Sequence, residues 1–438
     1  KDVKDLAVTI KKAFYIASTG RPGPVLVDIP KDVSMQAGLY DYPKEIEMRS
    51  YKPIDKGHTG QIRKAVQMML QAERPLVYAG GGVILSDSAP ELNQLVDRLD
   101  IPCVTTLQGL GGYRASSERH LGMPGMHGTY EANMAMQNCD VLVAIGARFD
   151  DRVTGKLDAF APAARVIHID IDPAEIGKNR APDVPIVGDV STVLNDLIPE
   201  IKRSQAIGGK PNLKPWWDEL NRLREEYAID YDQPCDKPTD GSLAPQWVIK
   251  QLSDHADPST IWVSDVGQHQ MWSAQLIDFE KPHSWISSGG LGTMGFGLPA
   301  AIGASVGSQR DFKGRKPVWL IAGDGSFQMT SEELTTAFLD HAPVKIAIIN
   351  NSVYGMVRQW QTLFFEQHYS QTNLADGDSK EGGEFFDVPD FVKLAEAYGC
   401  VGLRAFTEDE AIDAINKANE INDRPVLIDF RVWKDAMV

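Results

Sequence analysis

The sequence predicts an α/β protein with two doubly wound parallel-sheet domains and a remnant of a third domain. Strand and helix patterns alternate from Gly60 to about residue 200, and a second alternation begins near Gln246. The chain has 438 residues, whereas single hydrophobic cores stop growing at roughly 250–300 residues. We therefore place the remnant at residues 1–42, a central domain at 55–200, a linker with one helix at 201–244 and a last domain at 245–438.

The first segment is too small to fold alone. Leu6, Ile10 and Phe14 recur at helical spacing, and Val25–Ile29 is an apolar run that predicts a short buried strand. One helix and one strand cannot bury a core, so we expect residues 1–42 to pack against further sequence or against the next domain. The chain opens at Lys1 with neither an initiator methionine nor a signal segment, and we expect it to come from a longer protein.

Short apolar runs between turn residues predict the strands of both domains. In the central domain they lie at residues 75–79, 101–105, 140–145, 164–170 and 184–187, with a helix at 89–99. In the last domain they lie at 260–264, 317–322, 344–349 and 425–429. Residues 361–388, which are acidic and long for a turn, are expected to form a mobile lid loop.

Composition excludes several classes of function. Apolar residues make up 43% of the chain and no run reaches the length of a membrane span. The formal charge of −16 repels nucleic acid. Four cysteines lie far apart, which argues against zinc and disulfides and favours a reducing compartment such as the cytoplasm.

One constellation predicts a cation site. Gly323-Asp324-Gly325 directly follows a strand, and Asn350-Asn351 follows the next strand. Ligands of open α/β sheets bind beyond the carboxyl ends of strands. Asp324, Asn351 and the carbonyl of Val353 are hard oxygen donors suited to Mg²⁺ that carries a diphosphate. Ser326 is expected to lead into a helix in which Thr330 and Glu333 have capping-box spacing; the alternative is a turn and an unrelated asparagine pair.

This pattern resembles the signature of thiamine-diphosphate enzymes. The glycine-rich segment Ser287–Ala301, the string Asp265-Val-Gly-Gln-His-Gln270 and Gly355-Met-Val-x-Gln-Trp360 narrow the resemblance to the acetohydroxyacid (acetolactate) synthases. Strings of that family's flavin domain occur in the same order: Gly80-Gly-Gly82, residues 105–111, 125–128, 146–153 and 168–172. The resemblance covers essentially the whole chain, and it makes residues 1–42 the end of a pyrimidine-binding domain.

The resemblance implies a catalytic subunit that decarboxylates pyruvate and joins the two-carbon unit to a second pyruvate or to 2-ketobutyrate, the first common step of branched-chain amino-acid biosynthesis. The implied cofactors are thiamine diphosphate, Mg²⁺ and a structural, non-redox FAD. The thiamine diphosphate contacts would be Val266, Gly267, Gln268, His269, Gly292, Met294, Gly323, Asp324, Gly325, Ser326, Met329, Asn351, Gly355, Met356 and Val357.

The FAD contacts implied by the resemblance come from the first two segments of the chain. They are Arg21, Gly80, Gly81, Gly82, Thr106, Leu107, Met126, His127, Gly128, Arg148, Val153, Asp170 and Asp189. A salt bridge at the surface is the alternative for each arginine.

The resemblance also assigns the catalytic positions. Met294 would wedge the cofactor into a bent shape, Arg152 would hold the carboxylate of the acceptor acid, Trp360 would shape the acceptor site, and Lys31 would lie near its mouth. For Met294 and Trp360 the alternative is a place in the core.

The family's catalytic glutamate has no match and would lie upstream of Lys1, so we expect this chain to be inactive alone. We expect a homodimer or tetramer and a possible small regulatory subunit. Two alternatives stay open: a pyruvate oxidase in which FAD accepts electrons, and a non-catalytic cofactor-binding or assembly fragment.

Overall fold

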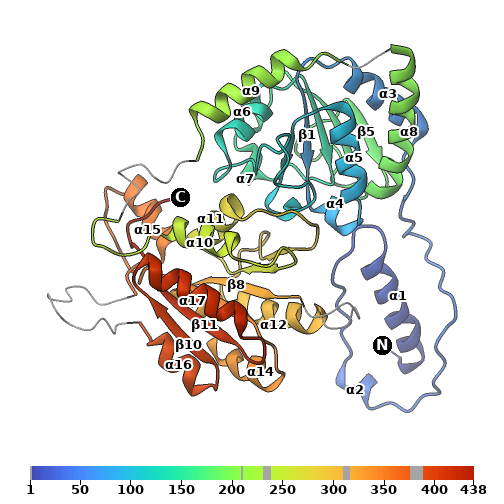
Figure 1. Cartoon of the computed structure of the whole chain (residues 1–438). Coiled ribbons are helices and arrows are strands. Elements are labelled where there is room, and N and C mark those ends of the chain that lie inside the picture. Colours follow the sequence, from blue (N-terminus) through green and yellow to red (C-terminus); the bar gives the residue numbers. More distant parts are fainter. Residues whose placement is uncertain (1, 209–210, 230–237, 309–315, 375–387) are drawn as a thin grey trace. The chain divides into compact units, whose positions relative to one another are not determined.

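The computed structural model describes residues 2–208, 211–229, 238–308, 316–374 and 388–438 (Figure 1). These residues form two compact units. The first comprises residues 1–102 and 135–217, and the second comprises residues 103–134 and 218–438. No helix among the described residues is both long and apolar enough to span a bilayer.

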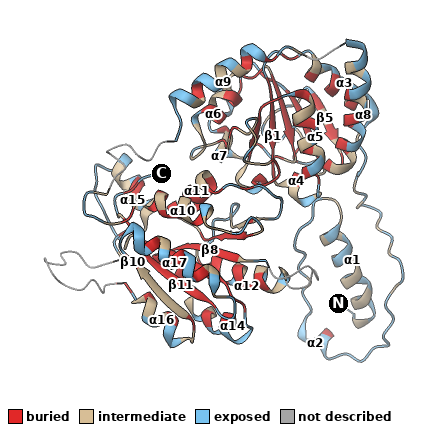
Figure 2. Cartoon of the chain, in the orientation of Figure 1, coloured by how far each residue is buried: buried red, intermediate tan, exposed pale blue. Residues whose placement is uncertain are grey.

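The first sheet has the strand order β2-β1-β3-β4-β5, and the pairs from β1 to β5 are parallel. Its strands are β1 (Pro75–Ala79), β2 (Cys103–Thr105), β3 (Val141–Ile145), β4 (Arg165–Asp170) and β5 (Val184–Val187). The predicted strands are thus confirmed to within two residues. Every residue of β1 is buried (Figure 2), and so is every residue of β3, as expected for apolar strands covered on both faces. The helices are α3 (Thr59–Leu70), α4 (Gly81–Leu85), α5 (Ala89–Leu99), α6 (Tyr130–Asn138), α7 (Asp151–Thr154) and α8 (Val190–Gly208).

The second sheet is parallel throughout, with the order β10-β11-β9-β8-β6-β7. Its strands are β6 (Ile261–Ser264), β7 (Trp285–Ser287), β8 (Val318–Gly323), β9 (Lys345–Asn350), β10 (Val401–Ala405) and β11 (Val426–Arg431). Alternate residues enter two different cores: Trp319 and Ile321 of β8 join one, and Leu320 and Ala322 join the other. The helices are α10 (Pro245–Asp254), α11 (Gln268–Leu276), α12 (Gly297–Ser308), α15 (Gly355–Phe364), α16 (Phe391–Ala397) and α17 (Glu408–Glu420). The predicted fold class is confirmed in that the chain has two parallel-sheet α/β domains.

Residues 103–134 group with the second unit although they begin with β2, a strand of the first sheet. Leu110 and Met123 join the core that contains Trp272 and Trp285. At Gly111, where φ is +81°, a Cβ would lie 2.2 Å from the Lys281 carbonyl oxygen. This close approach requires glycine.

The predicted linker contains α9 (Lys214–Glu226), whose Trp216 is buried and donates from Nε1 to the Pro75 carbonyl at 3.1 Å. The linker helix thus contributes to a core.

Three local predictions are wrong. Residues 25–29 form no strand, and Leu26 is 89% exposed, because no described strand lies beside them. They lie between α1 (Leu6–Ser18) and α2 (Lys31–Ser34). The helix after Ser326 is broken into α13 (Asp324–Phe327), a 3-10 turn and α14 (Leu334–Leu339), and Thr330 Oγ1 donates to the Gly295 carbonyl instead of forming a capping box. The lid prediction began too early, since residues 361–364 continue α15; its residues 375–387 lie outside the described residues.

Candidate functional site

Two adjacent strand ends of the second sheet bring the predicted cation ligands together. Asp324 follows β8 and is 2% exposed; its Oδ1 accepts the Gly325 amide at 2.9 Å, while its Oδ2 has no hydrogen-bond partner. Burial raises the pKa of Asp324 to about 7, against the opposing effect of the Gly325 and Ser352 amides. A buried carboxylate oxygen without a donor is costly in water-free surroundings and suits a cation. The residues present therefore fit Mg²⁺.

The second half of the cation site is the turn after β9. Asn351 is half-buried, and its Oδ1 accepts the Val353 amide at 3.2 Å, which leaves a lone pair for a further contact. Ser352 has a φ of +60°, a left-handed conformation uncommon for serine. Among the described residues no group of three or more His, Cys, Asp or Glu side chains is placed to hold a metal, and the site expected here contains only one such side chain.

Gln268 and His269 begin α11 directly after β6, and both are buried. A Cβ on Gly355 would lie 1.9 Å from Gln268 Oε1 and 2.9 Å from Asn351 Nδ2, so Gln268 and Asn351 flank this glycine. A Cβ on Gly323 would lie 3.0 Å from His269 Nδ1. Gln268 Oε1 and His269 Nε2 have no partner, and burial lowers the pKa of His269 to about 3. The structure thus gathers five predicted positions, with polar atoms available for a ligand.

The glycine-rich segment is fastened by Asp265, a residue that the sequence did not single out. Its carboxylate accepts the amides of Gly295 and Gly297 at 3.0 and 3.2 Å, and that of Val266 at 2.8 Å. Met294, next to Gly295, is half-buried, so the core alternative for this side chain is not met. Of the other predicted contacts, Ser326 and Gly325 are buried and Val266, Gly267 and Met356 are half-buried, whereas Gly292, Met329 and Val357 are exposed.

A cavity of about 910 Å³ opens beside α15, and its lining includes Met356, Val357 and Trp360. Trp360 is 44% exposed and meets Phe364 edge-on at 5.6 Å, which contradicts the alternative that it is a core side chain.

The glycine loop of the first unit packs against its own sheet. A Cβ on Gly80 would lie 2.2 Å from the Gly146 carbonyl oxygen, and one on Gly82 would lie 2.6 Å from Gly146 Cα. These glycines, with Gly81, connect β1 to α4 where β3 also ends. Their absent side chains permit the approach of two strand-end turns.

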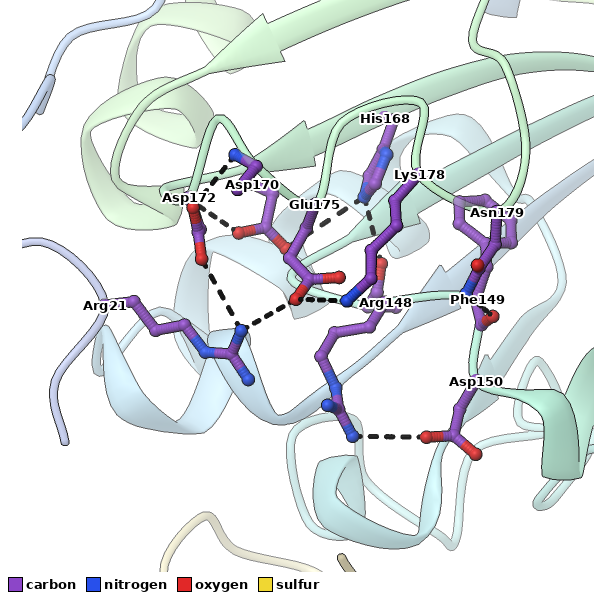
Figure 3. A network of polar contacts seen from close by, with 12 residues as sticks. Arg21, Arg148, Phe149, Asp150, His168, Asp170, Asp172, Glu175, Lys178 and Asn179 are labelled. Carbon is purple, nitrogen blue, oxygen red and sulfur yellow. Dashed lines mark hydrogen bonds and ion pairs between the residues drawn. The ribbon is translucent and has the colours of Figure 1, made fainter. Parts of the chain in front are cut away.

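A charged cluster lies beyond the carboxyl ends of β3 and β4 in the same sheet (Figure 3). Arg21 Nη1 lies 2.8 Å from Glu175 Oε1 and 3.5 Å from Asp172 Oδ2. Asp170, at the end of β4, is buried, and burial raises its pKa. Arg148 pairs with Asp150 at 3.2 Å. The salt-bridge alternative therefore describes both arginines.

The remaining predicted positions are scattered. In the first unit Val153 lies on α7, Lys31 is exposed at the start of α2, and Asp189 Oδ1 accepts the Thr192 amide at the start of α8. Arg152 has a side chain that is 75% exposed. In the second unit Thr106, Leu107, His127 and Gly128 are half-buried and Met126 is exposed. Burial lowers the pKa of His127.

Sequence reasoning also missed Gln359, which is buried on α15. Its Oε1 accepts Gln268 Nε2 at 2.8 Å, and the same Nε2 donates to the Ala436 carbonyl at 2.9 Å. The only signal in the sequence was its place in the Gly355-Met-Val-x-Gln-Trp360 string.

Comparisons with known proteins agree with this geometry. The family described as "Thiamine pyrophosphate enzyme, central domain" matches residues 62–197, and "Thiamine pyrophosphate enzyme, C-terminal TPP binding domain" matches residues 265–430. The chain is 51% identical to an acetolactate synthase of Mycobacterium bovis over 99% of the chain and 68% of that protein. It is 50% identical to an acetolactate synthase large subunit of Corynebacterium glutamicum (99% and 66%) and 41% identical to the large subunit of acetolactate synthase isozyme 3 of Escherichia coli (99% and 72%). The chain belongs to the acetolactate synthase large-subunit family of thiamine-diphosphate enzymes.

Proposed function

We propose that this chain is a catalytic subunit of acetolactate synthase, which decarboxylates pyruvate and joins the two-carbon unit to a second pyruvate or to 2-ketobutyrate. The observation that carries the proposal is the buried Asp324 carboxylate with its unpartnered Oδ2, beside the Asn351 turn. The relatives' names favour a synthase over the pyruvate oxidase and the non-catalytic fragment that the sequence left open.

Asp324, Asn351 and the Val353 carbonyl would hold Mg²⁺, and the Mg²⁺ would hold the diphosphate. The donor chemistry supports this, since Mg²⁺ prefers oxygen ligands and retains phosphate oxygens in its shell. Thiamine diphosphate supplies the carbon centre at which pyruvate loses carbon dioxide. The protein has to bind, orient and shield it.

The glycine-rich segment that Asp265 holds would orient the thiamine diphosphate. Three backbone amides converge on this buried carboxylate, so residues 295–297 are fixed relative to β6. Met294 precedes them, and we propose that it supports the cofactor's rings. Gln268, His269 and Gly323 would contact the diphosphate, with Ser326 holding the Gly323 turn through a 3.2 Å hydrogen bond from the Gly323 amide.

The acceptor acid would bind beside α15. Trp360 and Met356 give the 910 Å³ cavity an apolar wall that suits the alkyl end of a 2-keto acid. Arg152 is proposed to bind the carboxylate, because a guanidinium matches a carboxylate in geometry and charge. Lys31 is proposed to lie at the mouth of the site.

FAD is proposed as a structural cofactor. Asp170 at a strand end suits ribose hydroxyls, and Arg148 suits the flavin diphosphate. The fit is supported by Gly80 and Gly82, whose missing side chains keep the strand-end turn compact. We also propose the domain bounds expected from the sequence: a remnant at residues 1–42, a central domain at 55–200, a linker at 201–244 and a last domain at 245–438.

We propose that the subunit forms a homodimer or tetramer. We also propose that it binds a small regulatory subunit, since two of the relatives named above are large subunits. The described cysteines are free and buried, which suits a reducing compartment such as the cytoplasm.

The test combines the chain with FAD, Mg²⁺, thiamine diphosphate and pyruvate, with and without a supplied first domain of a relative. Acetolactate that forms on complementation, and is lost in Asp324→Ala, is the expected result. The matched control is Asp340→Ala, an aspartate at the exposed end of α14. Reduction of the flavin by pyruvate without acetolactate would favour the oxidase and overturn the proposal.

A further inference from the structure

The turn that would carry Asn351 and Val353 is attached to the neighbouring strand β11 through the side chain of Asn350. Asn350 is 1% exposed, and its Nδ2 donates to Asp429 Oδ1 of β11 at 2.8 Å. Its backbone carbonyl accepts the Val432 amide at 3.0 Å. The first asparagine of the pair is therefore engaged within the sheet and is not a cation ligand.

Asp429 is also hydrogen-bonded to β10, the strand on the other side of β11. It is 1% exposed, and its Oδ2 accepts Arg404 Nε of β10 at 3.0 Å. Arg404 and Asp429 are register partners in the parallel pair β10 and β11. Arg404 Nη2 also donates to Asp390 Oδ1 at 2.6 Å, and Asp390 caps the start of α16. A buried carboxylate with a charged partner and a hydrogen-bonded partner is fixed in one orientation.

The turn has a second brace. Ser352, in the left-handed conformation, donates from Oγ to Asn350 Oδ1 at 3.4 Å and receives Arg431 Nη2 at 3.5 Å. The Ser352 carbonyl accepts the Leu374 amide at 2.9 Å. A left-handed residue of this kind is strained and persists only where surrounding contacts fix it. Both ends of the Asn350 amide therefore help to define the turn.

We propose that Asp429 and Asn350 are positioning residues that hold Asn351 and the Val353 carbonyl in place for a divalent cation carrying a diphosphate. The inference rests on the proposed function. Outer-shell partners of ligands typically change metal affinity by about 10–100-fold when removed.

The hydrogen-bond polarity of this pair provides the test. In Asn350→Asp two carboxylates face each other. In Asp429→Asn the single amide oxygen can accept from Arg404 or from Asn350 Nδ2, and both partners are satisfied only if the Asn350 amide rotates, which removes its oxygen from Ser352 Oγ. In the double variant the new amide at position 429 accepts from Arg404 with its oxygen and donates with its nitrogen to the new carboxylate at position 350. Each contact is then restored, the second with reversed polarity.

The experiment measures Mn²⁺ affinity in the presence of thiamine diphosphate by electron paramagnetic resonance, with the unfolding temperature of each metal-free variant recorded alongside. Each single variant should bind Mn²⁺ about tenfold or more weakly, and the double variant should return to within about threefold of the parent. The matched control is Asn419→Asp on α17, where Asn419 bonds Trp319 Nε1 and the His255 carbonyl. It should leave Mn²⁺ affinity unchanged.

Singles that bind Mn²⁺ like the parent would overturn the inference. So would a double variant whose loss is the product of the two single losses, because that result would mean that the two side chains act independently. The rescue stays informative even if a single variant unfolds, since recovery of both fold and affinity requires the pair. A parent chain that binds no Mn²⁺ with thiamine diphosphate would overturn the proposed function, and this inference with it.

Discussion

Asp324 presents a conflict between stability and binding. Its folded-state pKa of about 7 lies above the reference value of 3.8. The folded chain therefore binds this proton more tightly than the unfolded chain does, and its stability falls as pH rises from about 4 through 7. Without a cation, the ionised carboxylate destabilises the fold at neutral and higher pH.

The variant Asp324→Asn removes that ionisation. At pH 8 the metal-free variant should be more stable than the parent, by on the order of 4 kcal/mol, while at pH 4 the two should unfold alike. Mg²⁺ with thiamine diphosphate should raise the unfolding temperature of the parent only. Thermal unfolding followed by circular dichroism from pH 4 to pH 8 measures both effects, and equal stability at every pH would contradict the assigned burial of charge.

Gly355 tests the packing around the proposed ligands. In Gly355→Ala the new Cβ would meet Gln268 Oε1 at 1.9 Å and Asn351 Nδ2 at 2.9 Å, so both side chains must move. Overpacking of this kind costs about 1–3 kcal/mol, and we expect thiamine diphosphate affinity, measured by calorimetry with Mg²⁺, to fall about tenfold or more.

The control for Gly355 is Gly303→Ala, on α12, where a Cβ would meet nothing within 4 Å. Alanine favours a helix over glycine by about 1 kcal/mol, so this variant should bind the cofactor normally and be slightly more stable. Equal affinity of the two variants would argue against the assigned place of Gly355.

At the scale of elements, the connection between β1 and α4 limits what the first unit tolerates. In Gly80→Ala a Cβ would lie 2.2 Å from the Gly146 carbonyl oxygen and 2.8 Å from Ala147 Cα, and these backbone atoms leave no flexible group to yield. We expect a lower affinity for flavin, measured by flavin fluorescence, and a lower unfolding temperature.

Gly208→Ala is the control, because nothing lies within 4 Å of that position at the end of α8. A Gly80→Ala protein that binds FAD like the parent would remove the glycine loop from the proposed flavin site.

The same scale explains which elements the sequence could predict. Central strands such as β3 are continuous apolar runs buried on both faces, and the pattern alone locates them. The strand β10 was missed because Gly402 and Arg404 interrupt its apolar pattern at the sheet edge. Residues 25–29 have a strand's composition but no neighbouring strand, and pairing, not composition, makes a sheet.

The site residues likewise divide into those that the sequence could predict and those that it could not. Asp324 and Asn351 were predictable because each directly follows a strand, so their meeting follows from sheet topology. Asp265 and Gln359 were not, since their roles depend on hydrogen bonds to residues distant in sequence, such as Gly297 and Gln268. Periodicity and local motifs carry no information about such partners.

At the scale of the whole molecule, the described residues form two units: β1 and β3–β5 belong to the first, and the second contains the whole six-stranded sheet together with β2. Every proposed Mg²⁺ and thiamine diphosphate contact belongs to the second unit. A ligand that binds only the folded state adds about 2.7 kcal/mol at a concentration of 100 times its dissociation constant. Exchange of amide hydrogens that requires unfolding of the binding unit should then slow by about 100-fold.

Hydrogen exchange measured by mass spectrometry tests this division. With Mg²⁺ and thiamine diphosphate, peptides from β8, β9 and β11 should gain that protection, whereas peptides from β1, β3 and β4 should exchange as before. Asp324→Ala serves as the control and should show no gain in either unit. Equal protection of both sheets would mean that they unfold together, because a ligand confined to one independent unit cannot slow the opening of the other.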